Sequence, residues 1–439
     1  MTFTSSLQTE LFDELKLDPK GRFFVAFSGG IDSTVLLHAM AQLQRQFGFH
    51  LTALHVSHNL QAESPQWAEH CERFCEDLMV DYKQTSLNLD SSAEEGARNA
   101  RYQWFREQVD RGDVLMTAHH QQDRAETLLF NLMRGAGSTG LSSLRSKRPF
   151  FGATLVRPLL RMSQADITQY AQEKALQWVE DPSNQRVDYS RNDIRHNVIP
   201  VLQAFRGDAI PNIARAAANL EQENGLLREI AISDLVDVRE QPVHPMDKSH
   251  ALCIDDLVHF SPARQVNLLR FWLHSLKLHS PSKRFLAELM SALNEPPAST
   301  AVLQEGGCQF RFYRGYMFVM QANSMDQTFD PLIWQNPEQS VALYQNKLRV
   351  GATSKLRDLI FSNSSAELRL ATRCDIPNPK ALQGHTLNLK KWMQEMGVPP
   401  WRRQALPLLT LSDDRDDVVL APVDQFLDND WVSIETSYF

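Results

Sequence analysis

The sequence lacks the features of a membrane, secreted or metal-cluster protein. Its 439 residues contain no run of about 18 apolar residues, so we expect no transmembrane helix. Its start, MTFTSSLQTELFDELKLD, carries acidic residues where a secretory signal has a basic and then an apolar stretch. The five cysteines are scattered and form no Cys-x-x-Cys pair, so neither a disulfide framework nor a zinc or iron–sulfur site is expected. These absences favour a cytoplasmic protein.

The chain also has no surplus of basic over acidic residues. The chain has 45 Lys and Arg against 53 Asp and Glu, a net charge of −8. Because many nucleic-acid-binding proteins are basic, this balance counts mildly against that class. It does not exclude the class, since binding depends on local patches rather than on the total charge.

The first 205 residues alternate short apolar runs with amphipathic stretches. We expect strands at 22–27, 51–58, 82–89 and 113–120, and helices at 33–47, 64–78, 93–109 and 123–135. This alternation is typical of a doubly wound α/β fold with a mostly parallel sheet. Ligands in such folds bind beyond the carboxyl ends of the strands.

The remaining residues predict two further domains. Residues 206–322 have helical spacing and end in two strand-like pieces, which indicates a mainly helical middle domain. Residues 323–345 are polar with two prolines and predict a linker. Residues 346–439 mix short strands with a helix at 387–398, which indicates a small α+β domain. The length of the chain agrees with two or three domains.

The stretch SGGIDS, residues 28–33, lies between the first expected strand and the first expected helix. Glycines let the backbone approach a ligand, and N–H groups at a helix start attract phosphate. Ser28 and Ser33 can add hydroxyl donors, whereas Asp32 would repel phosphate and is better suited to Mg²⁺. The alternative is a plain glycine turn with Asp32 or Ser33 as the helix N-cap. The position after the first strand favours phosphate binding.

The stretch is neither a Walker A motif nor a G-x-G-x-x-G turn. It resembles the PP-loop, S-G-G-x-D-S, of the N-type ATP pyrophosphatases, which cleave ATP between the α and β phosphates. Further segments narrow the resemblance: HVSHNL (55–60), EEGARNARYQWF (94–105), AHHQQDRAETLLFNLMRGAGSTGLSSL (118–144), RPLL (157–160), EDPSNQRVDYSRNDIRHNVIP (180–200) and LKKWMQEMGVPPWRRQALPLL (389–409). In this order they resemble bacterial tRNA(Ile)-lysidine synthetases over nearly the whole chain.

The resemblance implies an enzyme that uses ATP and Mg²⁺ to modify tRNA. Members of this family adenylate the C2 oxygen of the wobble cytidine in the CAU anticodon of tRNA(Ile). The ε-amine of free L-lysine then attacks C2 and displaces AMP, so that the base pairs with A in place of G. The tRNA's identity changes from methionine to isoleucine. The sequence leaves the formation of a homodimer open.

The resemblance, together with the residue chemistry, assigns a candidate site. The residues expected to bind ATP are Ser28, Gly29, Gly30, Ile31, Asp32, Ser33, His58, Arg98 and His120. The residues expected to be catalytic are Asp32, Asp123, Arg101 and Arg195, with Asp32 and Asp123 also holding Mg²⁺. Arg98 and Arg101 are three apart on a helix, so both can reach one anion. The alternatives are a solvated helix face for the arginines and, for Asp123, simple stabilisation of a helix start.

Three basic segments are candidates for tRNA contacts, which would make binding salt-dependent. They supply Arg145 and Arg148 in a loop, Arg191 and Asn192 at a helix start, and Lys390, Lys391, Arg402 and Arg403 near the C-terminus. The last four surround Trp392 and Trp401, for which we expect the tryptophans in the core and the charges facing RNA. The alternative is an ordinary amphipathic helix.

The chain departs from the family pattern H-x-D-D-Q-x-E-T at two positions, Gln122 and Arg124. A neutral amide is a weaker metal ligand than a carboxylate, while an arginine would add positive charge near the phosphates. We expect the second aspartate of the pattern, Asp123, to carry the role, because Asp123 and Glu126 are both retained. The two departures are the only support for a non-catalytic RNA-binding protein. A tRNA thiolase would need a catalytic or metal-binding cysteine set, and a GMP synthetase would need a glutaminase domain; neither is visible.

Overall fold

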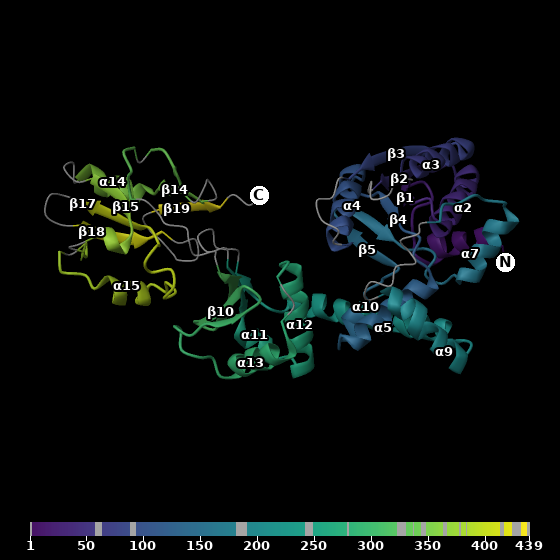
Figure 1. Cartoon of the computed structure of the whole chain (residues 1–439). Helices are drawn as coiled ribbons and strands as arrows, with labels where there is room; N and C mark the ends of the chain where they lie inside the picture. Colours follow the sequence, from purple (N-terminus) through teal and green to yellow (C-terminus); the bar gives the residue numbers. More distant parts are fainter. Residues whose placement is uncertain are drawn as a thin grey trace. The chain divides into compact units, whose positions relative to one another are not determined.

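The computed structural model shown in Figure 1 divides into two compact units, Met1–Leu226 and Leu227–Phe439. It describes residues 2–57, 64–87, 94–180, 191–241, 249–278, 281–322, 331–336, 338–343, 348–362, 367–376, 379–382, 384–412, 417–423 and 432–436. No helix within these ranges is long and apolar enough to cross a bilayer.

The first unit is built on one six-stranded sheet. Its strands are β1 (Arg22–Ala26), β2 (His50–Ser57), β3 (Asp81–Ser86), β4 (Val114–Met116), β5 (Lys147–Phe150) and β6 (Ala153–Val156). They lie in the order β3-β2-β1-β4-β6-β5, and all neighbours are parallel except the hairpin β5–β6. The predicted doubly wound, mostly parallel sheet is therefore confirmed. The chain reverses direction of winding between β1 and β4, where such sheets bind ligands.

Helices cover both faces of this sheet, as Figure 1 shows for α2 and α4. The helices are α1 (Phe3–Gln8), η1 (Thr9–Glu14), α2 (Ile31–Phe47), α3 (Ser64–Leu78), α4 (Glu94–Gln108), α5 (Gln121–Met133), α6 (Ser138–Leu141), α7 (Gln164–Glu173), α8 (Arg191–Asp193), η3 (Ile194–Val198), α9 (Ile199–Phe205) and α10 (Ala209–Val236). In β1, Phe23 and Val25 pack in the core formed with α2, while Phe24 packs with Phe105 of α4. Because alternate strand residues point to opposite faces, a strand covered on both sides must be apolar throughout.

The second unit begins with the middle of the chain. Its helices α11 (Ile254–Val258), α12 (Pro262–Ser275) and α13 (Lys283–Asn294) confirm a mainly helical region. They pack on an antiparallel sheet in the order β7-β8-β11-β10-β9, formed by β7 (Glu240–Gln241), β8 (His250–Cys253), β9 (Leu303–Glu305), β10 (Cys308–Tyr313) and β11 (Tyr316–Gln321). The two predicted strands are β10 and β11. The other three have two to four residues each, too few to show a period in the sequence.

The C-terminal part is α+β, as predicted. One sheet has the order β12-β15-β17-β18-β16 and another β13-β14-β19. The elements are β12 (Leu332–Ile333), β13 (Val341–Leu343), β14 (Leu348–Ala352), α14 (Ser354–Ser362), β15 (Glu367–Ala371), η5 (Arg373–Asp375), β16 (Pro379–Lys380), α15 (Leu389–Glu395), β17 (Leu408–Ser412), β18 (Asp417–Pro422) and β19 (Val432–Thr436). Strands β12 and β13 fall in the expected linker 323–345, so part of that segment belongs to the sheets. The domain boundaries expected at 205 and 322 stay predictions.

Candidate active site

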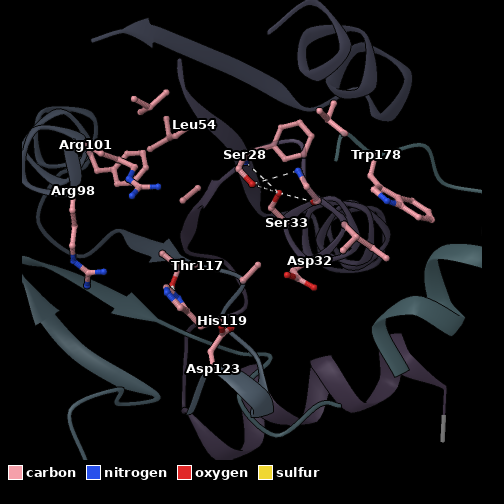
Figure 2. Close-up of a pocket in the computed structure, with 18 of the residues that line it drawn as sticks. Ser28, Asp32, Ser33, Leu54, Arg98, Arg101, Thr117, His119, Asp123 and Trp178 are labelled. Carbon is pink, nitrogen blue, oxygen red and sulfur yellow. Dashed lines mark hydrogen bonds between the residues drawn. The ribbon is translucent and has the colours of Figure 1, made fainter. Parts of the chain in front are cut away.

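The SGGIDS stretch forms a tight loop between β1 and α2. The Ser33 hydroxyl lies 3.1 Å from the Ser28 hydroxyl and accepts a hydrogen bond from the Ser28 N–H at 3.2 Å. It also donates to the Gly30 carbonyl at 3.0 Å (Figure 2). Gly30 is the N-cap of α2 and has no side chain to cover the helix start. The N-terminal N–H groups of α2 therefore open toward the space in front of the loop, which suits an anion.

Gly29 needs to be glycine for two reasons. Its φ angle is +83°, which side chains of L-residues rarely tolerate. A Cβ atom on it would lie 2.9 Å from the Cys71 sulfur, which is fully buried. The Cys71 side chain therefore packs directly against the loop at Gly29. Burial raises the pKa of the Cys71 and Cys75 thiols to about 12, so neither is a reactive thiolate.

We expect Gly29→Ala to destabilise the first unit. The left-handed backbone alone costs about 1–2 kcal/mol for a residue with a Cβ, and the contact with Cys71 adds to it. Adding Cys71→Ala should recover only the contact part. Gly30→Ala is the matched control, because its φ is −71° and its new Cβ would meet nothing closer than 3.5 Å. Thermal unfolding of the three variants and the unchanged protein measures this, and equal losses from both glycine changes would contradict it.

The loop opens into a cavity of about 700 Å³ at the carboxyl ends of the strands. Residues from separate elements line it: Ser28, Gly30, Ile31, Asp32 and Ser33 from the loop and α2, Arg98, Arg101, Tyr102 and Phe105 from α4, Thr117, His119 and Asp123 near α5, and Trp178, Val179 and Glu180 after α7. Of the predicted ATP-binding and catalytic residues, eight therefore line one cavity. The volume is large enough for a nucleotide.

His120 joins two carboxylates at the edge of this cavity. Its Nδ1 accepts the Gln122 N–H at 3.2 Å, and the Asp123 carboxylate accepts the His120 N–H at 2.9 Å, which together cap α5. Its Nε2 lies 3.9 Å from Asp32 Oδ2 and 3.5 Å from Asp123 Oδ2. With Nδ1 acting as acceptor, the ring proton is assigned to Nε2 and faces both carboxylates. His120 is buried and is not among the residues that line the cavity, so its ring is placed to orient the two carboxylates, and its contact with ATP stays a prediction.

The two carboxylates differ in electrostatics. Burial raises the pKa of Asp32, and the charge of Asp123 raises it further, against the opposing effects of His120 and a hydrogen bond from Gln164. Burial also acts to raise the pKa of Asp123, but His120, His119 and Arg195 outweigh it, so that pKa is lowered. For Asp32, burial and the charge of Asp123 thus outweigh the favourable effects of His120, Gln164 and Arg195. This is a suitable place for a cation.

Arg195 connects Asp123 to a buried glutamate. Its guanidinium donates to Glu126 Oε1 at 2.6 Å and Oε2 at 2.9 Å, and to Asp123 Oδ1 at 3.2 Å. Glu126 is only 1% exposed and also accepts from the Gln122 side chain at 3.0 Å. Gln122 therefore acts as a donor to Glu126. The carboxylate that lies on the other side of His120 from Asp32 is Asp123, and its role in catalysis stays a prediction.

Arg124 lies away from the cavity. It is 3% exposed and forms an ion pair with Glu221 of α10, whose carboxylate also accepts the Ser146 N–H at 2.9 Å. The expectation that this arginine adds charge near the phosphates is therefore corrected. It ties α5 to α10 and to the loop that precedes β5, because a buried guanidinium requires a counter-charge.

Other predicted residues are placed as follows. Arg98 is exposed and Arg101 half-buried, both lining the cavity, while His58 and the Arg191 side chain lie outside the described residues. Asn192, Arg145 and Arg148 are half-buried. His119, which the sequence analysis passed over, lines the cavity and contacts Thr117 Oγ1 at 2.9 Å. The motif alone does not show which of the two neighbouring rings, His119 or His120, faces the cavity.

The C-terminal arginines do not face solvent. Arg402 is 2% exposed and donates to Ser249 Oγ at 2.8 Å, and Arg403 is 8% exposed and donates to the Val398 carbonyl at 2.9 Å. The expectation that these two charges face outward is therefore corrected, because both side chains are buried inside the second unit. Lys390 and Lys391 are exposed and remain predicted tRNA contacts.

Three family models match the chain in order: a PP-loop domain over residues 3–202, the TilS substrate binding domain over 252–318 and the TilS substrate C-terminal domain over 373–433. The tRNA(Ile)-lysidine synthase of Pseudomonas aeruginosa is 36% identical over 403 residues, or 90% of this chain and 88% of that protein. Those of Yersinia pseudotuberculosis and Coxiella burnetii are 33% and 32% identical, over 89% and 90% of this chain and 87% and 88% of theirs.

Proposed function

The chain belongs to the tRNA(Ile)-lysidine synthase family, and from this premise we propose that its cavity brings together ATP, L-lysine and the wobble cytidine of tRNA(Ile) with a CAU anticodon. The enzyme is an ATP-dependent ligase that forms a C–N bond. The observation that carries the proposal is the PP-loop with a carboxylate pair in front of it, in a chain that matches the family along its length.

In the first step, the cytidine O2 attacks the α-phosphorus of ATP and pyrophosphate leaves. The loop N–H groups and the hydroxyls of Ser28 and Ser33 are suited to hold the phosphates, since donors fixed in advance stabilise the charge that builds on their oxygens. Arg101 lines the same cavity and would stabilise the transition state. The cytidine must be unstacked from the anticodon loop to enter, because C2 lies within the base.

Asp32 and Asp123 fit a magnesium ion. Mg²⁺ binds oxygen ligands and commonly uses one or two carboxylates together with substrate phosphates and water. Burial and the charge of Asp123 raise the pKa of Asp32, and a bound cation would offset both effects by favouring the ionised carboxylate. When bound, the ion would neutralise charge on the phosphate oxygens.

In the second step, the ε-amine of lysine attacks C2, and AMP leaves with the original O2 of the base. The side chain of lysine arrives as an ammonium, and Asp123, held ionised by His120 and Arg195, is suited to attract it. The ammonium must then lose one proton to water before its nitrogen has the electron pair that attacks C2, and the bond from C2 to the AMP oxygen breaks as the C–N bond forms. Homodimer formation and a cytoplasmic location stay predictions.

The test is incorporation of radiolabelled lysine into unmodified tRNA(Ile) with a CAU anticodon, in the presence of ATP and Mg²⁺. We expect ATP-dependent label on the tRNA, and none on the same tRNA with the wobble C changed to U, since the uridine is not the base that this family modifies. Labelling of both tRNAs, or release of pyrophosphate without labelling of either, would contradict the proposal. Binding of tRNA without ATP consumption would favour a non-catalytic RNA-binding protein.

A further inference from the structure

Three arginines surround Tyr102 on α4, and we name Arg98, Arg148 and Arg157 the arginine cluster. The Cζ atoms of Arg98 and Arg148 lie 5.2 and 5.9 Å from the centre of the Tyr102 ring, and Arg157 interacts with its hydroxyl. Figure 2 shows Arg98 and Arg101 across the cavity from Ser28 and Asp32. The cluster is therefore separate from the PP-loop.

No carboxylate among the described side chains neutralises the arginine cluster. Among the side chains that the structure describes, none of the three guanidinium groups is paired with a carboxylate. Arg157 is 2% exposed, and although one of its nitrogens donates to the Arg145 carbonyl at 2.7 Å, its buried Nε has no hydrogen-bond partner. Burial, with the nearby charges of Arg148 and Arg98, lowers the pKa of Arg157 to about 10. Guanidinium groups gathered in this way are typical of phosphate-binding sites.

The position of the cluster indicates which phosphate it binds. The phosphates of ATP already have the N–H groups of the PP-loop and α2. Tyr102 and Arg98 line the cavity, whereas Arg148 lies beyond it on β5, the edge strand of the sheet. The positively charged side chains therefore extend from Arg98 at the cavity wall to Arg148 on the edge strand β5. A nucleotide whose base enters the cavity keeps its backbone phosphates at the mouth.

We propose that Arg98 and Arg148, with buried Arg157 adding positive charge behind them, form a subsite for a backbone phosphate of the anticodon loop, next to the cytidine that reacts. The inference rests on the proposed function and reassigns Arg98, which the sequence had placed with ATP. Tyr102 acts as a positioning residue, because its ring and hydroxyl hold all three arginines in one place.

The test compares Arg98→Ala and Arg148→Ala with Arg106→Ala. Arg106 is the matched control, because it also lies on α4 and stacks on an aromatic ring, that of Phe151 at 4.4 Å, but does not line the cavity. For each cluster variant we expect the KM for tRNA to rise on the order of 5- to 10-fold and the slope of log K for tRNA binding against log salt to fall by about 1. The KM for ATP should not change, and Arg148→Lys should retain the salt slope.

Two outcomes would overturn the inference. A rise in the KM for ATP with an unchanged KM for tRNA would mean that the cluster serves the phosphates of ATP. Unchanged values for both, or a change equal to that of Arg106→Ala, would mean that the arginines only support the fold. The salt titration of tRNA binding needs no catalysis, so it tests the subsite even if the chain fails to form lysidine.

Discussion

Replacing Asp32 with asparagine is expected to abolish lysidine formation while making the protein more stable. The carboxylate stands before the PP-loop where phosphate charge must be neutralised, so we expect a loss of at least about 10²–10³-fold in kcat. Its pKa is raised in the folded state by burial and by Asp123. Ionised Asp32 therefore costs folding free energy, and asparagine removes that cost.

The change in the free energy of unfolding caused by Asp32→Asn depends on pH, and the direction of the pKa shift fixes how. A carboxyl whose pKa is raised by folding favours the folded state below its unfolded pKa, and this contribution is lost as pH rises through the folded pKa. The stability gained by Asp32→Asn should thus be small in acid and grow toward neutral pH. Urea unfolding of the protein without ATP or Mg²⁺, at several pH values, measures it.

Asp123→Asn is the informative companion variant. The pKa of Asp123 is lowered, so its ionised form stabilises the folded state at neutral pH, and this stability is lost as pH falls through the folded pKa. Both variants should lose activity, but their stabilities should change in opposite directions. Asp77→Asn, on the exposed side of α3, should change neither. A loss of stability in Asp32→Asn would show that the carboxylate holds the fold together.

The sequence predicts those parts of the site that depend on neighbours along the chain. SGGIDS contains all that the loop needs, because the glycine with positive φ, the helix start and the two hydroxyls follow one another directly. The parallel sheet could be predicted for the same reason, since each strand and its helix are continuous segments. Arg98 and Arg101 reach the cavity because α4 carries both on one face.

What depends on packing between distant segments could not be predicted. Arg402 and Arg403 lie in a basic stretch that resembles an RNA-binding surface, yet they are buried because Ser249 and the Val398 carbonyl satisfy them. Arg124 is likewise inside because Glu221, 97 positions away, pairs with it. The hairpin β5–β6, with four residues in each strand, is too short to show a period.

Breaking the pair between Arg195 and Glu126 is expected to be the most costly single change for folding among those considered. Arg195→Ala leaves Glu126 as a carboxylate with 1% exposure and only Gln122 as a side-chain donor among the described residues. Removing one partner of a buried pair costs about 3–5 kcal/mol, and we expect the lower end because Gln122 remains. Arg206→Ala, in an exposed pair with Asp208, is the control and should leave the free energy of unfolding unchanged.

The double variant Arg195→Met with Glu126→Gln separates folding from chemistry. A neutral glutamine needs no counter-charge and can still accept from Gln122, so the double variant should be more stable than Arg195→Ala. Turnover should stay low, because Asp123 has also lost the guanidinium 3.2 Å from its Oδ1. Urea unfolding and lysine incorporation measured on the same preparations decide between two roles. If only the free energy of unfolding recovers, Arg195 takes part in the reaction. If lysine incorporation recovers as well, the ion pair serves only to hold η3 against α5.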